Sequence, residues 1–146
     1  MMTPQDVARL HWGIDPHFLA YVGSLPDGMI EAREPAEQRD HDFLFPEVGT
    51  QPGRIQFAGA IRFFGHGGLL EVLLQDPAIE SDKNGSILTV TGPSGRAAML
   101  NLRTTDSERG TLFESTLRGE AVQWFGGVYL PGRPFGQVRI CRRQSG

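Results

Sequence analysis

The fold is indicated above all by one stretch of sequence, Ile55-Gln-Phe-Ala-Gly-Ala-Ile-Arg-Phe-Phe-Gly-His66-Gly-Gly-Leu-Leu-Glu-Val-Leu-Leu-Gln-Asp76-Pro77. Apolar residues alternate with other residues before His66 and again after it, a period of two that places one row of side chains on a buried face. The glycines around His66 permit the positive φ angles of a turn. We predict a β-hairpin that presents the His66 imidazole at its turn. Its second strand should end at Asp76-Pro77, because proline removes a ladder donor.

The length and composition favour one β-rich domain. The chain has 146 residues and is 39% hydrophobic, enough for one core and too short for two ordinary domains. Its 19 glycines and 10 prolines follow no period, which indicates many turns between short strands. We therefore predict a single domain over residues 1–146, mainly β, built as an antiparallel β-sandwich or open barrel with one or two short helices near the N-terminus.

A helix is predicted over residues 16–25. Asp15 is a suitable N-cap, and Pro16 suits the first helical position. The other predicted elements are, in chain order, a helical or irregular lead-in (3–10), a strand (29–33), an exposed loop (34–42), an apolar segment interrupted by proline (43–46), strands (86–91, 97–103, 112–117 and 135–141) and, over 119–134, a loop carrying Tyr129.

Charge and cysteine content narrow the classes of function. A formal net charge of -3 gives no electrostatic footprint for nucleic acid, so we predict no nucleic-acid partner. Cys141 is the single cysteine, which rules out a disulfide within the chain. The N-terminus lacks a basic leader with an apolar segment, and no stretch is apolar enough to cross a bilayer. As given, the sequence predicts a cytoplasmic protein without a membrane segment.

Common catalytic and metal-binding motifs are absent from the sequence. The four histidines have no spacing typical of zinc ligands, and the lone cysteine cannot form a CxxC pair. There is no GxSxG elbow, and the glycines match neither phosphate-binding pattern. We therefore predict that the protein is not an enzyme and holds no metal through protein ligands alone.

The tyrosines and histidines leave two interpretations open. A phenolate is a recognised haem ligand, and a neighbouring histidine that donates a hydrogen bond to its oxygen favours the charged form. Tyrosines and histidines set in apolar surroundings would therefore suit a flat ligand that carries a ferric ion. On the other interpretation these residues are structural, and His66 is a solvated side chain at a hairpin tip.

Three segments carry a resemblance to a known family. The first is Leu10-His-Trp-Gly-Ile-Asp-Pro-His-Phe-Leu-Ala-Tyr21-Val, and the second runs from Phe57 to Pro77, with a glycine before His66 and a terminal Asp-Pro. A weaker match lies at Phe125-Gly-Gly-Val-Tyr129-Leu-Pro-Gly. Together they resemble the signatures of HtaA-type haem-binding domains of bacteria, and the resemblance spans nearly the whole chain.

This resemblance implies a β-rich, non-catalytic module that binds ferric haem b for haem uptake, transfer or storage. It implies that Tyr21 is the axial ligand of the haem iron and that His66 hydrogen-bonds to the phenolate. The other implied site residues are pocket candidates (His17, Phe18, Phe63, Phe64 and Tyr129) and propionate candidates (Arg62 and Arg133). Neighbours on a strand point to opposite faces, so only one of Phe63 and Phe64 should contact a porphyrin.

Several alternatives stay open at this point. His17 stands where the family usually has a small hydroxyl residue, one helical turn before Tyr21, so it could crowd the haem, add a ligand or replace Tyr21. Family members are usually exported. The implied partners are haem and a haem-donor or haem-acceptor protein, and a homodimer is left open. The alternative function is a structural or protein-interaction domain of the same fold that has lost haem binding.

Overall fold

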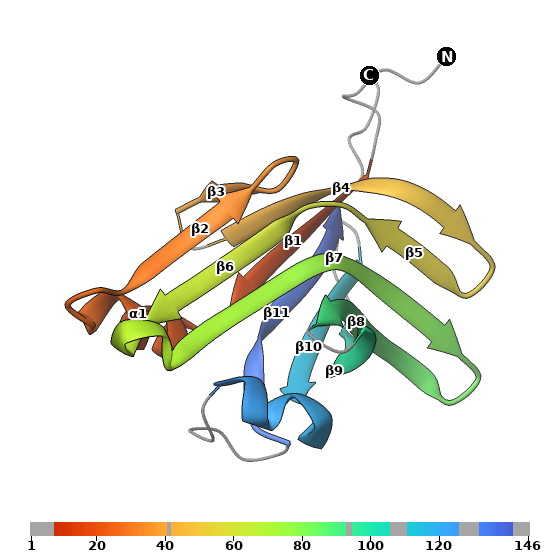
Figure 1. Ribbon diagram of the computed structural model, residues 1–146. Helices are drawn as coiled ribbons and strands as arrows, with labels where there is room; N and C mark the ends of the chain where they lie inside the picture. Colours follow the sequence, from red (N-terminus) through yellow and green to blue (C-terminus); the bar gives the residue numbers. More distant parts are fainter. Residues whose placement is uncertain (1–7, 41, 93–94, 106–110, 126–131, 142–146) are drawn as a thin grey trace.

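Antiparallel strands dominate the computed structural model, which describes residues 8–40, 42–92, 95–105, 111–125 and 132–141 (Figure 1). The strands are β1 (Arg9–Ile14), β2 (Met29–Arg33), β3 (Glu37–Arg39), β4 (Asp42–Gln51), β5 (Arg54–Phe57), β6 (Ala60–Gly65), β7 (Leu70–Asp82), β8 (Gly85–Gly92), β9 (Gly95–Thr105), β10 (Thr111–Leu117) and β11 (Pro134–Cys141). The helices are α1 (Pro16–Ser24) and two short 3₁₀ segments, η2 (His66–Gly68) and η3 (Gly119–Phe125). The mainly β class predicted from the sequence is confirmed.

The sheet closes on itself, so the architecture is a barrel rather than a sandwich or an open barrel. Eight strands form the ring in the order β7-β5-β4-β1-β11-β10-β9-β8, and β8 pairs again with β7. Closure removes exposed strand edges from this part of the sheet. The first half of β7 extends beyond the ring and pairs with β6, and β6 pairs with β2. We call these three paired segments the β2–β6–β7 extension.

The predicted hairpin is present, but its strands have other limits. β6 and the first half of β7 are antiparallel, with Gly65 opposite Leu70. The prediction that the second strand ends at Asp76-Pro77 is wrong, because β7 continues to Asp82. The pairing register shifts between Gln75 and Ala78, so Pro77 sits in a bulge where no ladder donor is required.

The first strand of the hairpin is divided at Gly59. Its φ is +125°, and a Cβ atom there would lie 2.5 Å from the Ala36 Cβ, so the chain turns where only glycine fits. The Asp76 N–H donates to the Gly59 carbonyl oxygen (2.8 Å), and the Gly59 N–H donates to the Asp76 carboxylate (3.1 Å). The break in one strand and the bulge in the next therefore satisfy each other's hydrogen bonds.

Other predicted elements are mostly confirmed. The strands at 29–33, 86–91, 97–103, 112–117 and 135–141 correspond to β2, β8, β9, β10 and β11. The helical or irregular lead-in is wrong where it can be compared, because Arg9 and Leu10 belong to β1. β4 also continues through Pro46 rather than stopping there. Part of the predicted loop at 119–134 is the 3₁₀ segment η3, and Tyr129 lies outside the described residues.

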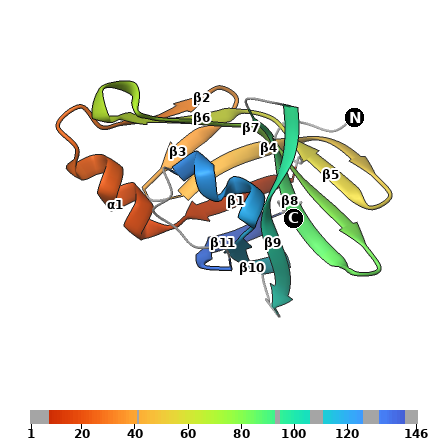
Figure 2. The same cartoon turned by 60° about the horizontal axis from the view of Figure 1, so that its bottom comes forward.

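Helix α1 forms where the sequence predicts it and packs against β1, β2 and β6 (Figure 2). The Asp15 carboxylate accepts the His17 backbone N–H, and Pro16 occupies the first turn. Phe18 and Val22 form the buried face of α1. The Phe18 ring meets the Phe63 ring of β6 edge to face, with centroids 4.9 Å apart. These contacts attach α1 to the same extension that ends at His66.

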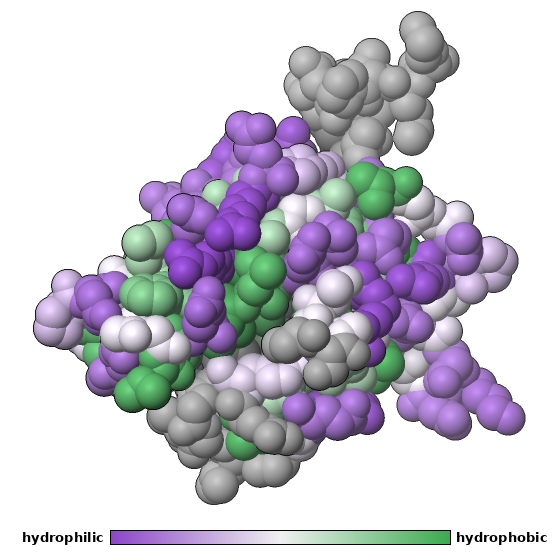
Figure 3. All heavy atoms as spheres, in the orientation of Figure 1, coloured by the Kyte–Doolittle hydropathy of each residue, from purple (hydrophilic) through white to green (hydrophobic). Residues whose placement is uncertain are grey.

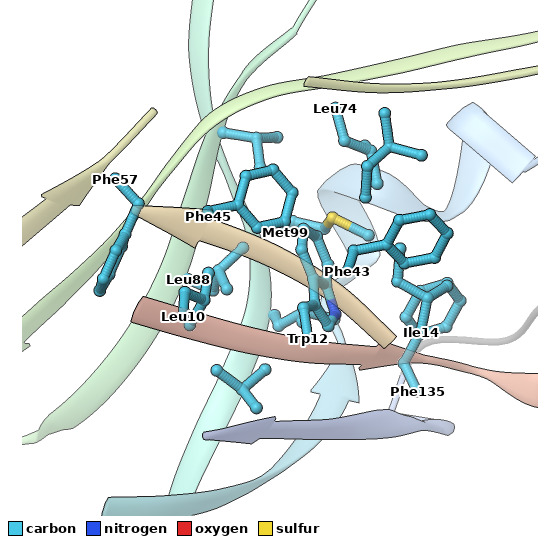
Figure 4. Close-up of a cluster of buried hydrophobic side chains, with 14 of the residues drawn as sticks. Leu10, Trp12, Ile14, Phe43, Phe45, Phe57, Leu74, Leu88, Met99 and Phe135 are labelled. Atoms are coloured by element: carbon cyan, nitrogen blue, oxygen red, sulfur yellow. The ribbon is translucent and has the colours of Figure 1, made fainter. Parts of the chain in front are cut away.

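The hydrophobic core fills the space inside the barrel and under the extension (Figure 4). Large aromatic side chains supply much of it: Trp12 from β1, Phe43 and Phe45 from β4, and Phe135 from β11 are essentially inaccessible to solvent. Burying one such side chain stabilises a fold by roughly 1.5–3 kcal/mol. The core thus provides a rigid support for the chain segments on its edge.

Candidate functional site

Tyr21 and His66 lie side by side although 45 residues separate them in the sequence. Tyr21 is on α1, half-buried and packed against the core, while His66 is exposed at the hairpin turn. The Tyr21 phenol oxygen is 2.7 Å from His66 Nε2, a hydrogen-bonding distance, and the ring centroids are 5.9 Å apart. The fold therefore brings together the two residues to which the family resemblance assigns the iron ligand and its hydrogen-bond donor.

The backbone at His66 adopts a conformation that would suit glycine better. Its φ is +51°, and the next two residues, Gly67 and Gly68, have φ of +62° and +100°. A non-glycine residue in this left-handed region costs on the order of 1 kcal/mol or more. A glycine at position 66 would avoid that cost, so the histidine is explained by what its imidazole contacts rather than by the turn.

The carboxylate of Asp27 connects the end of α1 to the His66 turn. Asp27 Oδ1 accepts the His66 backbone N–H at 3.0 Å, and Oδ2 accepts the Gly67 backbone N–H at 2.7 Å. Close packing accompanies these bonds, because a Cβ atom on Gly65 would lie 2.5 Å from Leu25 Cδ1. The segment that follows α1 and the hairpin turn are therefore joined through both polar and apolar contacts.

The Asp27–turn contact should depend on pH in the acid range. The Gly67 N–H, and after it the His66 N–H, lowers the pKa of Asp27 below its usual value by hydrogen bonding to the carboxylate. The unfolded chain then takes up the proton first, so the stabilisation is complete above about pH 4–5 and is lost as the pH falls through the lowered pKa. Amide exchange measured by NMR should give protection factors for the His66 and Gly67 N–H groups that stay constant from neutral pH to about pH 5. The protection should be lost only below about pH 4. Loss of protection already near pH 6 would contradict this assignment.

His17 is directed to another contact. Its side chain is largely exposed, and Nδ1 lies 3.3 Å from the carboxylate of Asp15 at the start of α1. The structure thus pairs Tyr21 with His66, while His17 interacts with the N-cap.

The predicted aromatic walls lie in different surroundings. Phe18 and Phe63 are in the core and expose almost no surface, which fits support of α1 better than direct ligand contact. Phe64 is half-buried on the other face of β6, as strand parity predicts, with the Arg62 guanidinium 4.9 Å from its ring centroid. Tyr129 lies outside the described residues.

The two propionate candidates also differ in position. Arg62 Nη2 is 3.2 Å from the Glu71 carboxylate on the neighbouring strand, so its charge is already paired. Arg133 is exposed just before β11, and its carbonyl oxygen accepts the Leu117 backbone N–H.

Two residues near the pair were missed by sequence reasoning. Asp27 lies in a Pro-Asp-Gly turn, where aspartate needs no further explanation, and its bonding partners are 39 and 40 residues away. Leu69 follows the turn with 93% of its surface exposed, and its N–H donates to the His66 carbonyl oxygen. An exposed leucine beside a hairpin turn gives no clear signal in a sequence, because Leu69 stands directly before Leu70, the first buried residue of the next strand.

Other kinds of site find little support in the part of the chain that the structure describes. Among these residues, no three His, Cys, Asp or Glu side chains are grouped closely enough to hold a metal ion. No helix formed by the same residues has the length and apolar character needed to span a membrane.

Comparison with known proteins identifies the family. No curated protein sequence matches the chain. The structure is similar to the C-terminal domain of HtaA from Corynebacterium glutamicum, with a TM-score of 0.76, 21% identity and coverage of 93% of this chain and 95% of that one. The heme binding protein HtaB from the same organism gives a TM-score of 0.74, 15% identity and 94% coverage of both chains.

A third similar structure is a domain-swapped dimer of the HtaA C-terminal domain from the same organism, in a variant with one histidine replaced by alanine. Its TM-score is 0.61, with 20% identity and coverage of 88% of this chain and 91% of that one. At these identities the structural likeness establishes the fold. The family model described as Htaa matches residues 7–140, nearly the full length, and the chain therefore belongs to the HtaA family.

Proposed function

We propose that this protein is a non-catalytic module that binds ferric haem b, with the Tyr21 phenolate as the iron ligand and His66 as a hydrogen-bond donor to that oxygen. The observation that carries the proposal is the 2.7 Å contact between the Tyr21 oxygen and His66 Nε2. A phenolate is a known ligand of haem iron, and a donor N–H directed at its oxygen favours the charged form.

The surroundings of the pair fit a flat, partly apolar ligand. Tyr21 is half-buried at the edge of the core, and the neighbouring His66 and Leu69 are exposed. Hydrophobic residues reach the surface at this end of the extension, next to hydrophilic ones (Figure 3). Haem would supply a ferric ion for the phenolate and an apolar ring that covers such surface. HtaB, which has the same fold, is a heme binding protein, and this supports the same ligand class here.

The proposed role is haem uptake, transfer or storage, with a haem-donor or haem-acceptor protein as partner. A second copy of the chain is a further proposed partner, because a related domain is found as a domain-swapped dimer. The alternative, an interaction domain that has lost haem binding, draws on the same exposed Leu69. Titration of the purified protein with haemin separates the two: the proposal requires a saturable Soret band and a high-spin ferric spectrum, and an unchanged haemin spectrum would refute it.

Removal of the His66 imidazole should weaken haem binding without abolishing it. We expect His66→Ala to reduce the affinity roughly 10–100-fold, the usual effect of losing a residue that supports a metal ligand. His66→Gln, which keeps an N–H donor, should retain part of the affinity. The affinity is measured by haemin titration, and size-exclusion chromatography shows whether each variant keeps the wild-type oligomeric state.

The matched control for this experiment is His17→Ala. His17 lies one helical turn from Tyr21 but contacts Asp15, so its loss should change the affinity by less than about threefold. A larger loss in His17→Ala than in His66→Ala would contradict the assignment and identify His17 as the residue that acts on the iron or its ligand.

A further inference from the structure

The carboxylate of Asp27 contacts the backbone of the turn that carries His66 beside Tyr21. We propose that Asp27 is the positioning residue of this pair: its carboxylate binds the backbone of the turn and so fixes where the imidazole can point. The inference deepens the proposed function and rests on it for its consequence in haem binding. The positioning itself can be tested apart from haem, because the contacts that define it join Tyr21 to His66 and Asp27 to the turn.

The backbone of the turn is shaped to bind the Asp27 carboxylate. His66 and Gly67 both have left-handed φ, which makes their successive N–H groups converge on one side, an arrangement that binds anions. Each oxygen of the Asp27 carboxylate accepts one of these N–H groups, at 3.0 and 2.7 Å. Hydrogen bonds to a charged acceptor are stronger than neutral ones, so they offset the cost of the left-handed histidine.

Asp27 lies three residues after α1, which ends at Ser24. Between Tyr21 and Asp27 the chain is held by Val22, which is buried, and by Leu25, which packs against Gly65. The phenol and the carboxylate are therefore presented from one short, anchored segment. The Tyr21 phenol oxygen contacts the imidazole of His66, and the Asp27 carboxylate contacts its backbone N–H. One short segment therefore contacts both the side chain and the backbone of this histidine.

Asp27 acts on the imidazole only indirectly. Both of its oxygens are engaged with the backbone of the turn, so its effect on the imidazole passes through the chain. Without the carboxylate, the turn would keep the flexibility of two consecutive glycines, and the imidazole would sample several orientations. A hydrogen bond of 2.7 Å depends steeply on direction, so a mobile imidazole would support the phenolate less of the time.

The test uses NMR of the full chain without haem. In the wild-type background, Tyr21→Phe should shift the NMR signals of the His66 imidazole, because it removes the phenol oxygen that the imidazole contacts. In the Asp27→Asn background, Tyr21→Phe should shift the His66 imidazole signals by less than about a third of the wild-type shift. The reason is that coupling between two sites is lost when a shared partner is removed. Asp82→Asn is the matched control: Asp82 also accepts a turn N–H, that of Asn84 at 2.7 Å, but in the β7–β8 turn. In the Asp82→Asn background, Tyr21→Phe should shift the His66 signals as much as it does in the wild-type protein.

Haemin titration tests whether the position of His66 affects haem affinity. Asp27→Asn should weaken haem binding about 10-fold, and the double variant Asp27→Asn/His66→Ala should bind no more weakly than His66→Ala alone. Additive losses, or an undiminished response of His66 to Tyr21→Phe in the Asp27→Asn protein, would overturn the proposal. If the wild-type protein bound no haem, the proposed function would fail, and the NMR measurement would still decide whether Asp27 positions His66.

Discussion

Tyr21→Phe is expected to abolish specific haem binding. The substitution keeps the ring that packs against the core and removes only the oxygen, which lies 2.7 Å from His66 Nε2. Because that oxygen is the proposed iron ligand, the loss of affinity should exceed the roughly 100-fold upper range for residues that merely support a ligand. Haemin titration should show neither a saturable Soret band nor the high-spin ferric spectrum of the wild-type protein.

The folded state should survive this change, so the loss can be assigned to the ligand. Tyr21 is half-buried and keeps its apolar contacts as phenylalanine, so the free energy of unfolding should change by no more than about 1 kcal/mol. Tyr129→Phe, which removes the phenol oxygen of the other tyrosine, should have a smaller effect on the spectrum. An unaltered spectrum in Tyr21→Phe would show that another residue contacts the iron.

Gly136→Ala should cause a large loss in the free energy of unfolding. Gly136 lies in β11 opposite Ile14, with φ of +98°, and a Cβ atom there would be 1.9 Å from the Gly13 carbonyl oxygen. The obstructing atom belongs to the backbone of β1, so no rotamer change relieves the clash and the two strands must separate. We expect a loss of about 3 kcal/mol or more, which lowers the Tm of a domain of this size by roughly 6–12 °C.

The glycine in α1 provides the control for this prediction. Gly23 is exposed, and a Cβ atom there would meet nothing within 4 Å. Gly23→Ala should therefore raise the free energy of unfolding by up to about 1 kcal/mol, because alanine favours the helix and restricts the unfolded chain. Thermal and urea unfolding of both variants measure the contrast. Equal stability of Gly136→Ala and the wild-type protein would show that β1 and β11 do not approach so closely.

The local elements could be predicted from the sequence because their causes are local. The alternation of apolar residues gave the β6–β7 hairpin, and Asp15-Pro16 gave the start of α1. Closure of the barrel could not be found in this way. It depends on β7 passing through Pro77 in a bulge. At that bulge Asp76 is hydrogen-bonded to both the N–H and the carbonyl oxygen of Gly59, which is distant in sequence.

The candidate site shows the same division. Tyr21 and His66 were selected by resemblance to a family, whereas the pattern of residues alone favoured a structural role. Asp27 could not be selected, because its turn sequence is already explained by turn chemistry and its partners are backbone atoms on a remote segment. Phe63 and Phe64 were correctly placed on opposite faces, since parity along a strand is a local property.

The two halves of β7 belong to different parts of the sheet. The half that pairs with β5 and β8 belongs to the closed ring, while the half that pairs with β6 projects from it and ends at the turn beside Tyr21. Hydrogen bonds at the projecting end can break without opening the ring, and such partial opening requires less free energy than global unfolding. If the proposed haem site is correct, this arrangement would let haem bind and leave at the tip of the extension while the barrel stays folded.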